Sequence, residues 1–151
     1  MKGSCFCGAW KFRVKEGAKP SFSVYCHCRL CTKFYGAVTA LVGWSKGDLD
    51  VSEGEENLKG FKSSEAMTRF HCTQCGGPAY NQSHMEGNEF RDLPLLLFDS
   101  KEEGSHEIDN YDVLRPKAHI HFAPTEMDSV WFEDGLPKFS GFPGSPIVQK
   151  T

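Results

Sequence analysis

The sequence lacks any long hydrophobic run. Its longest apolar stretch spans residues 93–98 and contains Pro94, far below the roughly 20 residues that a helix needs to cross a bilayer. The opening residues Met1 to Cys5 do not lead into the apolar core of about 7–15 residues that marks a secretory signal. We therefore expect a cytoplasmic protein without a membrane partner, in a reducing compartment where thiols stay unpaired.

An excess of positive charge is also missing. Lys and Arg number 17 against 20 Asp and Glu, which gives a formal net charge of −3 and a pI near 6.1. The densest local charge is acidic, in residues 48–56 and 99–112, and no basic run is present. Because nucleic-acid binding depends on clustered Lys and Arg, the sequence predicts no nucleic-acid partner.

Internal repeats are absent, and 151 residues suit one domain. We expect a single domain over residues 1–151. The tail is rich in Gly and Pro between residues 135 and 146, so we expect residues 138–151 to form a C-terminal strap over the body.

Apolar residues mostly alternate with polar ones, which is typical of half-buried strands. Only residues 29–35, which lack Gly and Pro and precede Gly36, suit a short helix. Residues 43–64 and 99–112 suit loops or edge strands. The fold class predicted is mainly β with little helix, with strands over residues 10–14, 22–26, 37–44, 67–70, 93–98, 119–122 and 130–132.

Cysteine is too scarce for a disulfide scaffold. The chain has seven cysteines, about 5% of its residues, whereas such scaffolds have more than roughly 8–10%. An odd number cannot pair completely within one chain. The cysteines lie in three groups, Cys5 and Cys7, then Cys26, Cys28 and Cys31, then Cys72 and Cys75. These C-x-C and C-x-x-C spacings favour metal binding over disulfides.

The count indicates two metal sites of different kinds. The knuckle from Cys72 to Gly77 gives one ion two sulfurs, and its glycines suit a tight turn. Two closed four-cysteine sites would need eight sulfurs, so one site has only three. A closed site is structural by default, and three protein ligands leave a position for water or substrate, as in catalytic zinc sites. The group of three, Cys26, Cys28 and Cys31, is favoured as the open site.

Three other interpretations compete with an open zinc site. His27 lies between two ligand cysteines and would have to fold back to become a fourth ligand, so we favour solvent exposure or a hydrogen bond for it. A thioredoxin-like pair of Cys28 and Cys31 needs an α/β frame that the pattern lacks. A non-catalytic, zinc-stabilised binding or interaction module remains the main alternative.

The cysteine motifs resemble those of the glutathione-dependent formaldehyde-activating enzyme and centromere protein V family. The likeness extends beyond the cysteines and runs from about residue 3 to residue 137. Its landmarks are residues 3–8, 26–31, 58–64, 70–76, 116–120 and Trp131 with residues 134–137. The resemblance implies a β-tent of antiparallel strands built around zinc, and a carbon–sulfur lyase acting on thiol adducts.

The resemblance also implies which cysteines share an ion. By position, the structural zinc falls to Cys5, Cys7, Cys72 and Cys75, and the catalytic zinc to Cys26, Cys28 and Cys31. The chain departs from the family between Glu86 and Pro94, where it keeps only a loose version of the usual Gly, Leu and paired Asp. This region would shape the substrate pocket, so the resemblance does not fix the substrate.

These expectations combine into a mechanism. Three thiolates on a dication leave one net negative charge, and a substrate thiolate would add a second, so a nearby cation is needed. Arg29 and Lys33 are the sequence candidates, although exposed surface positions suit them as well. The expected substrate is a small thiol adduct, of which S-hydroxymethylglutathione is an example.

Proton transfer needs a titratable group beside the metal. His119 and His121 stand two apart on a predicted strand and would face one side. His119 occupies the family's matching position and is the candidate acid or base, with burial in the core as the equal alternative. Phe122, Trp131 and Phe132 are candidates to line a pocket or to fill the core.

Overall fold

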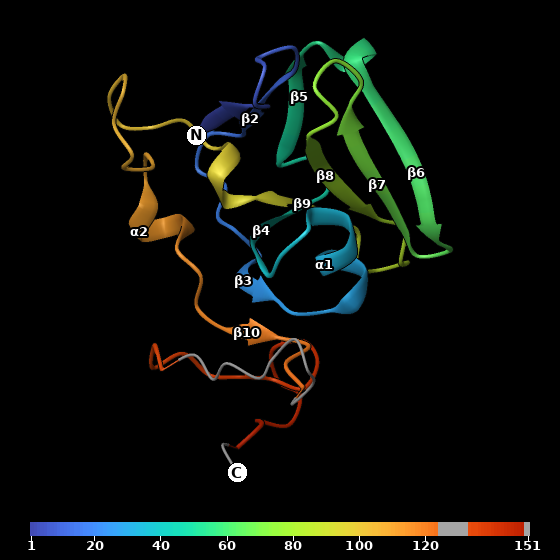
Figure 1. The fold of residues 1–151 in the computed structure, drawn as a ribbon, viewed down its shortest axis with the longest axis vertical. Helices are drawn as coiled ribbons and strands as arrows, with labels where there is room; N and C mark the ends of the chain where they lie inside the picture. Colours follow the sequence, from blue (N-terminus) through green and yellow to red (C-terminus); the bar gives the residue numbers. More distant parts are fainter. Residues whose placement is uncertain (124–132, 150–151) are drawn as a thin grey trace.

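The strands of the protein form two sheets (Figure 1). The structure is a computed structural model and describes residues 1–123 and 133–149. Within these residues, a three-stranded sheet has the order β1 (Lys2–Ser4), β2 (Lys11–Val14), β5 (Leu49–Glu53). The larger, seven-stranded sheet has the order β10 (His119–Ile120), β3 (Phe22–Cys26), β4 (Thr39–Ser45), β9 (Phe90–Pro94), β8 (Pro78–Ser83), β7 (Met67–Cys72), β6 (Leu58–Ser64).

Helix is scarce in the described part of the chain. It consists of α1 (Arg29–Tyr35), the single turn α2 (Tyr111–Leu114), and the 3₁₀ turns η1 (Glu55–Asn57) and η2 (Leu95–Leu97). Neighbouring strands are antiparallel, except that β10 runs parallel to β3. The prediction of a mainly β fold with little helix is confirmed. None of the described helices has the length and apolar character needed to span a bilayer.

The helix predicted over residues 29–35 is confirmed at both ends. At its start, the Cys28 sulfur accepts a hydrogen bond from the Cys31 amide at 3.2 Å. At its end, Gly36 takes a left-handed conformation, φ 82°, and its amide bonds to the Thr32 carbonyl at 2.9 Å. Such a C-terminal glycine stops a helix without steric cost.

The strand predicted over residues 93–98 is partly wrong. β9 occupies residues 90–94, and the chain then enters η2. Pro94 has no amide proton with which to extend the ladder, and Leu96 is 82% exposed, so the apolar run does not continue as a buried strand. The segment predicted as loop or edge strand, residues 43–64, contains β5 and the edge strand β6. The strand predicted over residues 130–132 lies outside the described residues.

Two hydrophobic cores hold the sheets and the helix together. The larger core joins the sheets and contains Trp10, Phe12, Trp44 and Leu93, each at most 1% exposed. Alternation in β2 explains this, since Phe12 and Val14 are buried while Lys11 and Arg13 are exposed. A smaller core packs β3, β4 and β10 against α1 and consists of Val24, Cys26, Cys31, Leu41, Ala118 and Ile120. The second core therefore fixes the position of two cysteines.

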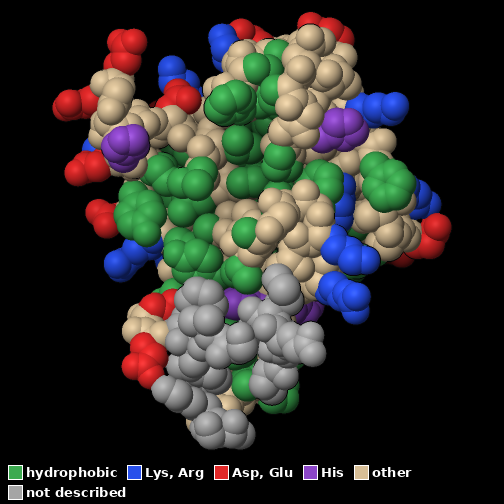
Figure 2. Space-filling model, viewed as in Figure 1, with side chains coloured by type: hydrophobic (Ala, Val, Ile, Leu, Met, Phe, Trp, Pro, Cys, Tyr) green, Lys and Arg blue, Asp and Glu red, His purple; other side chains and the backbone are tan. Residues whose placement is uncertain are grey.

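Charged side chains are distributed unevenly over the surface (Figure 2). The acidic segment over residues 99–112 projects at the left of the view, where Glu102, Glu103, Glu107 and Asp109 are exposed. Lys and Arg side chains gather along the right-hand side of the same face.

Candidate metal sites and cavity

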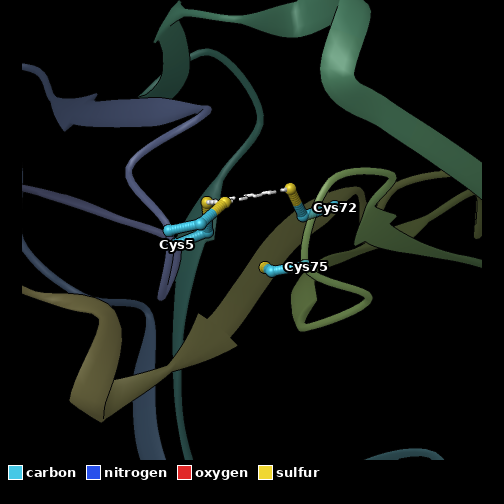
Figure 3. Close-up of side chains that lie close together, drawn as sticks. Cys5, Cys72 and Cys75 are labelled. Carbon is cyan, nitrogen blue, oxygen red and sulfur yellow. Dashed lines mark hydrogen bonds between the residues drawn. The ribbon is translucent and has the colours of Figure 1, made fainter.

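The first cysteine cluster brings the two ends of a long stretch of chain together. Cys5 and Cys7 follow β1, while Cys72 ends β7 and Cys75 belongs to the turn before β8. The labelled side chains point toward one another across the gap between the sheets (Figure 3). Gly76, at φ 72°, closes the turn, with its amide on the Cys72 carbonyl at 2.9 Å. This positive φ favours glycine, as the sequence predicted.

The spacing of these sulfurs suits zinc. Cys5 and Cys7 have their sulfurs 3.5 Å apart, and each lies 3.8 Å from the Cys72 sulfur. Ligands at the Zn–S distance of about 2.3 Å in a tetrahedron lie about 3.8 Å from one another. A disulfide would need sulfurs about 2.05 Å apart, and all seven cysteines are free. The cluster can therefore hold one zinc ion with four sulfur ligands.

The second cluster has three sulfurs. Cys26 ends β3, Cys28 caps α1 and Cys31 lies in its first turn, and their sulfurs lie within 4.8 Å of one another. No other Cys, His, Asp or Glu of the described chain joins this group. Three thiolates meet zinc's preference for sulfur and leave one tetrahedral position without a ligand from residues 1–123 or 133–149.

Hydrogen bonds among the three thiols shift their pKa values in opposite directions. Hydrogen bonds from Cys26 and Cys31 hold the pKa of Cys28 well below its usual range. The same bond to Cys28 raises the pKa of Cys26 well above it. One thiolate thus forms readily, and ionising all three requires a cation among them.

His27 does not join the three cysteines. Its ring is buried and its Nε2 lies 2.8 Å from the Nδ1 of His119. Of the two fates expected for His27, the hydrogen bond is observed and solvent exposure is not. The ligand interpretation has no support among the described residues.

His119 lies in a buried network beneath the C-terminal segment. It is 1% exposed, and its Nε2 bonds to the Oδ2 of Asp134 at 2.7 Å. Asp134 also accepts a hydrogen bond from Lys138 at 3.0 Å. Burial lowers the pKa of His119 despite the opposing effect of Asp134. Partial burial would raise the pKa of Asp134, but hydrogen bonds from His119 and Lys138 lower it.

A cavity of about 110 Å³ opens beside the three cysteines. His121 lines it, whereas His119 does not. The chain leaves β10 after Ile120, and His121 adopts φ 51°, so the two rings have different surroundings. The catalytic role of His119 stays a prediction, and its position favours a structural one.

The cation beside the cysteines is Arg69, which the sequence analysis missed. Arg69 is 6% exposed, and both Nη atoms lie 3.8 Å from the Cys31 sulfur. Its Nη1 donates to the Asn81 Oδ1 at 3.1 Å and its Nε to the Ser63 Oγ at 3.2 Å. Arg29 and Lys33, the sequence candidates, are both exposed. A buried guanidinium is better placed to offset thiolate charge than an exposed one.

Asp92 is a second missed residue. Asn81 donates from Nδ2 to the Asp92 Oδ1 at 2.6 Å and to the Tyr35 hydroxyl at 2.9 Å. Burial raises the pKa of Asp92 to about 7, Asn81 and Arg69 oppose this increase, and the Cys28 thiolate adds to it. The carboxyl group lines the cavity together with the cysteines. It can therefore exchange a proton near neutral pH.

These polar residues reach one face of the sheet through strand register. Arg69 pairs with Asn81, Asn81 pairs with Asp92, and Asp92 pairs with Gly43 on β4. Directly opposed residues in paired strands project to the same face. The row crosses β7, β8, β9 and β4 and forms a wall of the cavity.

Residues 1–122 match the sequence model of the family described as glutathione-dependent formaldehyde-activating enzyme. The chain belongs to this family. The family resemblance that the sequence analysis drew from the cysteine motifs is thus confirmed. A crystal structure of a Rhodobacter sphaeroides protein, a structural genomics target, is similar with a TM-score of 0.55 and 24% identity, over 68% of this chain and 92% of that chain. That likeness concerns the fold alone.

Family membership puts the missed residues in context. Asp92 lies in the region from Glu86 to Pro94, which the sequence analysis expected to shape the substrate pocket of this member of the formaldehyde-activating family. That expectation connected the region with the pocket but did not single out Asp92. Phe122 is 1% exposed and fills the core, while Trp131 and Phe132 lie outside the described residues.

Proposed function

We propose that the protein is a zinc-dependent carbon–sulfur lyase that cleaves the adduct of a thiol with an aldehyde, the class to which S-hydroxymethylglutathione belongs. The observation that carries the proposal is the three-cysteine cluster with a cavity beside it and a buried arginine against one sulfur. Two zinc ions per chain are part of the proposal, a structural one on Cys5, Cys7, Cys72 and Cys75 and a catalytic one on Cys26, Cys28 and Cys31.

Zinc at the open site would keep a substrate thiol deprotonated near neutral pH and stabilise it as a leaving group. The chain's own contribution begins with Arg69. Three thiolates on a dication carry one net negative charge, which the guanidinium 3.8 Å from Cys31 offsets. With this charge offset, a bound substrate thiolate leaves one net negative charge at the site. Without the guanidinium it would leave two.

Asp92 supplies the proton transfer. In cleavage, its carboxylate takes the proton from the adduct hydroxyl, the C–O bond becomes the aldehyde C=O, and the C–S electron pair leaves with sulfur. In the reverse direction the protonated carboxyl returns the proton to the alkoxide oxygen. Asn81 orients this carboxyl because its Nδ2 donates to Asp92 and its Oδ1 accepts from Arg69.

The experiment that tests this function measures exchange between free and thiol-bound formaldehyde by magnetisation-transfer NMR. The protein with zinc should accelerate exchange above the rate in buffer, and Cys28→Ser should abolish the acceleration while retaining one zinc per chain. If the protein binds two zinc ions but does not accelerate the exchange with any thiol, it is instead a zinc-stabilised interaction module.

A further inference from the structure

The lining of the cavity beside the three cysteines contains residues of two kinds. Arg69, Asn81 and Asp92 form the polar wall. The rest of the lining is mostly apolar and includes Phe22, Val24, Leu41, Phe90, Ile120 and Phe142. A substrate whose sulfur approaches the cysteines therefore presents its oxygen to the polar wall and its remaining body to hydrocarbon.

The volume limits the size of that body. A protein cavity of about 150 Å³ holds benzene, and ordinary small-molecule sites measure roughly 300–1,000 Å³, whereas this cavity measures about 110 Å³. The apolar part of the lining is also tightly packed. The Phe22 ring lies so close to Gly43 that a Cβ there would stand 2.2 Å from it, and the ring packs edge-to-face on Phe90 at 5.2 Å. A cavity of this volume has room for a short carbon chain beside the sulfur.

The charges limit the substrate further. Among the described residues that line the cavity, Arg69 is the only Lys or Arg. Its nitrogens already contact Ser63, Asn81 and Cys31. Glutathione carries two carboxylates and an ammonium group, and a carboxylate without a partner is strongly disfavoured in such a cavity.

The geometry points to a small, uncharged thiol as the carrier in the adduct, a short alkyl or hydroxyalkyl thiol rather than glutathione. The reaction of this adduct rests on the proposed function, but the binding preference rests on the size, lining and charge of the cavity alone.

The exposed cations of α1 define the competing arrangement. Arg29 and Lys33 are exposed on the helix that carries Cys31, and Lys and Arg side chains gather at the right of the face in Figure 2. If glutathione placed only its sulfur in the cavity, its carboxylates would bind such cations outside. This arrangement predicts that removing Arg29 and Lys33 weakens glutathione binding.

Binding to the cobalt-substituted protein tests the preference without turnover. Dissociation constants of propanethiol, 3-mercaptopropionate and glutathione are measured from the change in the sulfur-to-cobalt absorption band. Propanethiol should bind at least about tenfold more tightly than either acid, because specificity of this size follows from an unpaired polar group in an apolar pocket. 3-Mercaptopropionate separates the effect of charge from that of size.

Two variants at exposed apolar positions sharpen the test. Phe142 is 48% exposed and lines the cavity, so Phe142→Ala should widen it and improve glutathione binding relative to propanethiol. Leu96 is 82% exposed and lies on η2, so Leu96→Ala should change neither constant.

Glutathione binding as tight as that of propanethiol, and its loss in Arg29→Ala/Lys33→Ala, would overturn the inference. So would the failure of every thiol to bind. If propanethiol binds as expected and no adduct is cleaved, the lyase proposal fails and the binding preference stands.

Discussion

Arg69 places both Nη atoms 3.8 Å from the sulfur of Cys31, although 38 positions separate the two residues. The guanidinium also lies 5.5 Å from the centre of the Phe34 ring, on the same helix as Cys31. β7 and α1 thus meet through a cation at the cysteine cluster.

Replacing Arg69 with Met should weaken zinc binding at the three-cysteine site. Without the guanidinium the thiolates hold protons more tightly, so zinc should dissociate at a higher pH during acidification. Turnover should fall on the order of a hundredfold, the usual effect of removing a preorganised electrostatic partner. Arg69→Lys keeps the charge, so it should restore part of the zinc affinity and part of the turnover. Arg29→Ala should change neither the pH of zinc release nor the turnover. An unchanged zinc-release profile in Arg69→Met would contradict the role of the cation.

Asp92→Asn should abolish a pH dependence of both activity and stability. Activity for cleavage should rise through pH 7 in the wild type, because the base is the carboxylate and its pKa is about 7. The variant should lose this rise, with a rate lower by roughly 10²–10⁴. A variant that keeps the rise would exclude Asp92 as the base.

The stability effect of Asp92 has a defined sign. The folded protein holds this proton more tightly than the unfolded chain, whose carboxyl titrates near 3.8. The free energy of unfolding should therefore fall as the pH rises from about 4 to about 7, by on the order of 4 kcal/mol. Denaturant unfolding of Asp92→Asn across that range should lack the decrease.

The two cysteine clusters should respond differently to serine substitution. Cys75→Ser should lower the free energy of unfolding by several kcal/mol, because a structural zinc site contributes to folding. Cys28→Ser should instead lose one zinc per chain with a small change in the unfolding midpoint. Metal analysis and thermal unfolding measure both quantities, and equal destabilisation by the two variants would refute separate roles.

His119→Gln should affect stability rather than the pH dependence of turnover. Breaking its bond to Asp134 should cost about 1–3 kcal/mol. Because burial lowers the pKa of His119 below 6.5, the wild type should lose stability as the pH falls below that value, and the variant should not. If His119→Gln instead removes a pH-dependent rise or fall in turnover that the wild type shows, His119 acts as a catalytic acid or base.

Local features of the sequence predicted much of this structure. The helix over residues 29–35 follows from local causes, a capping sulfur at Cys28 and a left-handed Gly36. Alternation predicted β2, because a strand with one buried face has a period of two. The apolar run over residues 93–98 was predicted as one buried strand, and this was partly wrong. Pro94 ends the strand, and nothing local in the sequence shows that Leu96 faces solvent.

The polar residues of the cavity could not be predicted in this way. Arg69 lies in the strand predicted over residues 67–70, and an Arg side chain in a half-buried strand is ordinarily exposed. Its burial depends on Asn81 and on Cys31, which come from another strand and a helix. His119 had a plausible sequence position for catalysis, but its surroundings depend on Asp134, 15 residues later.

The sequence by itself determined which cysteines form groups, because C-x-C and C-x-x-C spacings hold sulfurs together within a single turn. Tertiary structure decided what faces the open cluster. Arg69, Asn81 and Asp92 share a face only because three strands pair in one register, and register depends on the packing of the whole sheet. Shifting one strand by a single residue would turn its polar side chain to the opposite face and leave the cysteines without their cation.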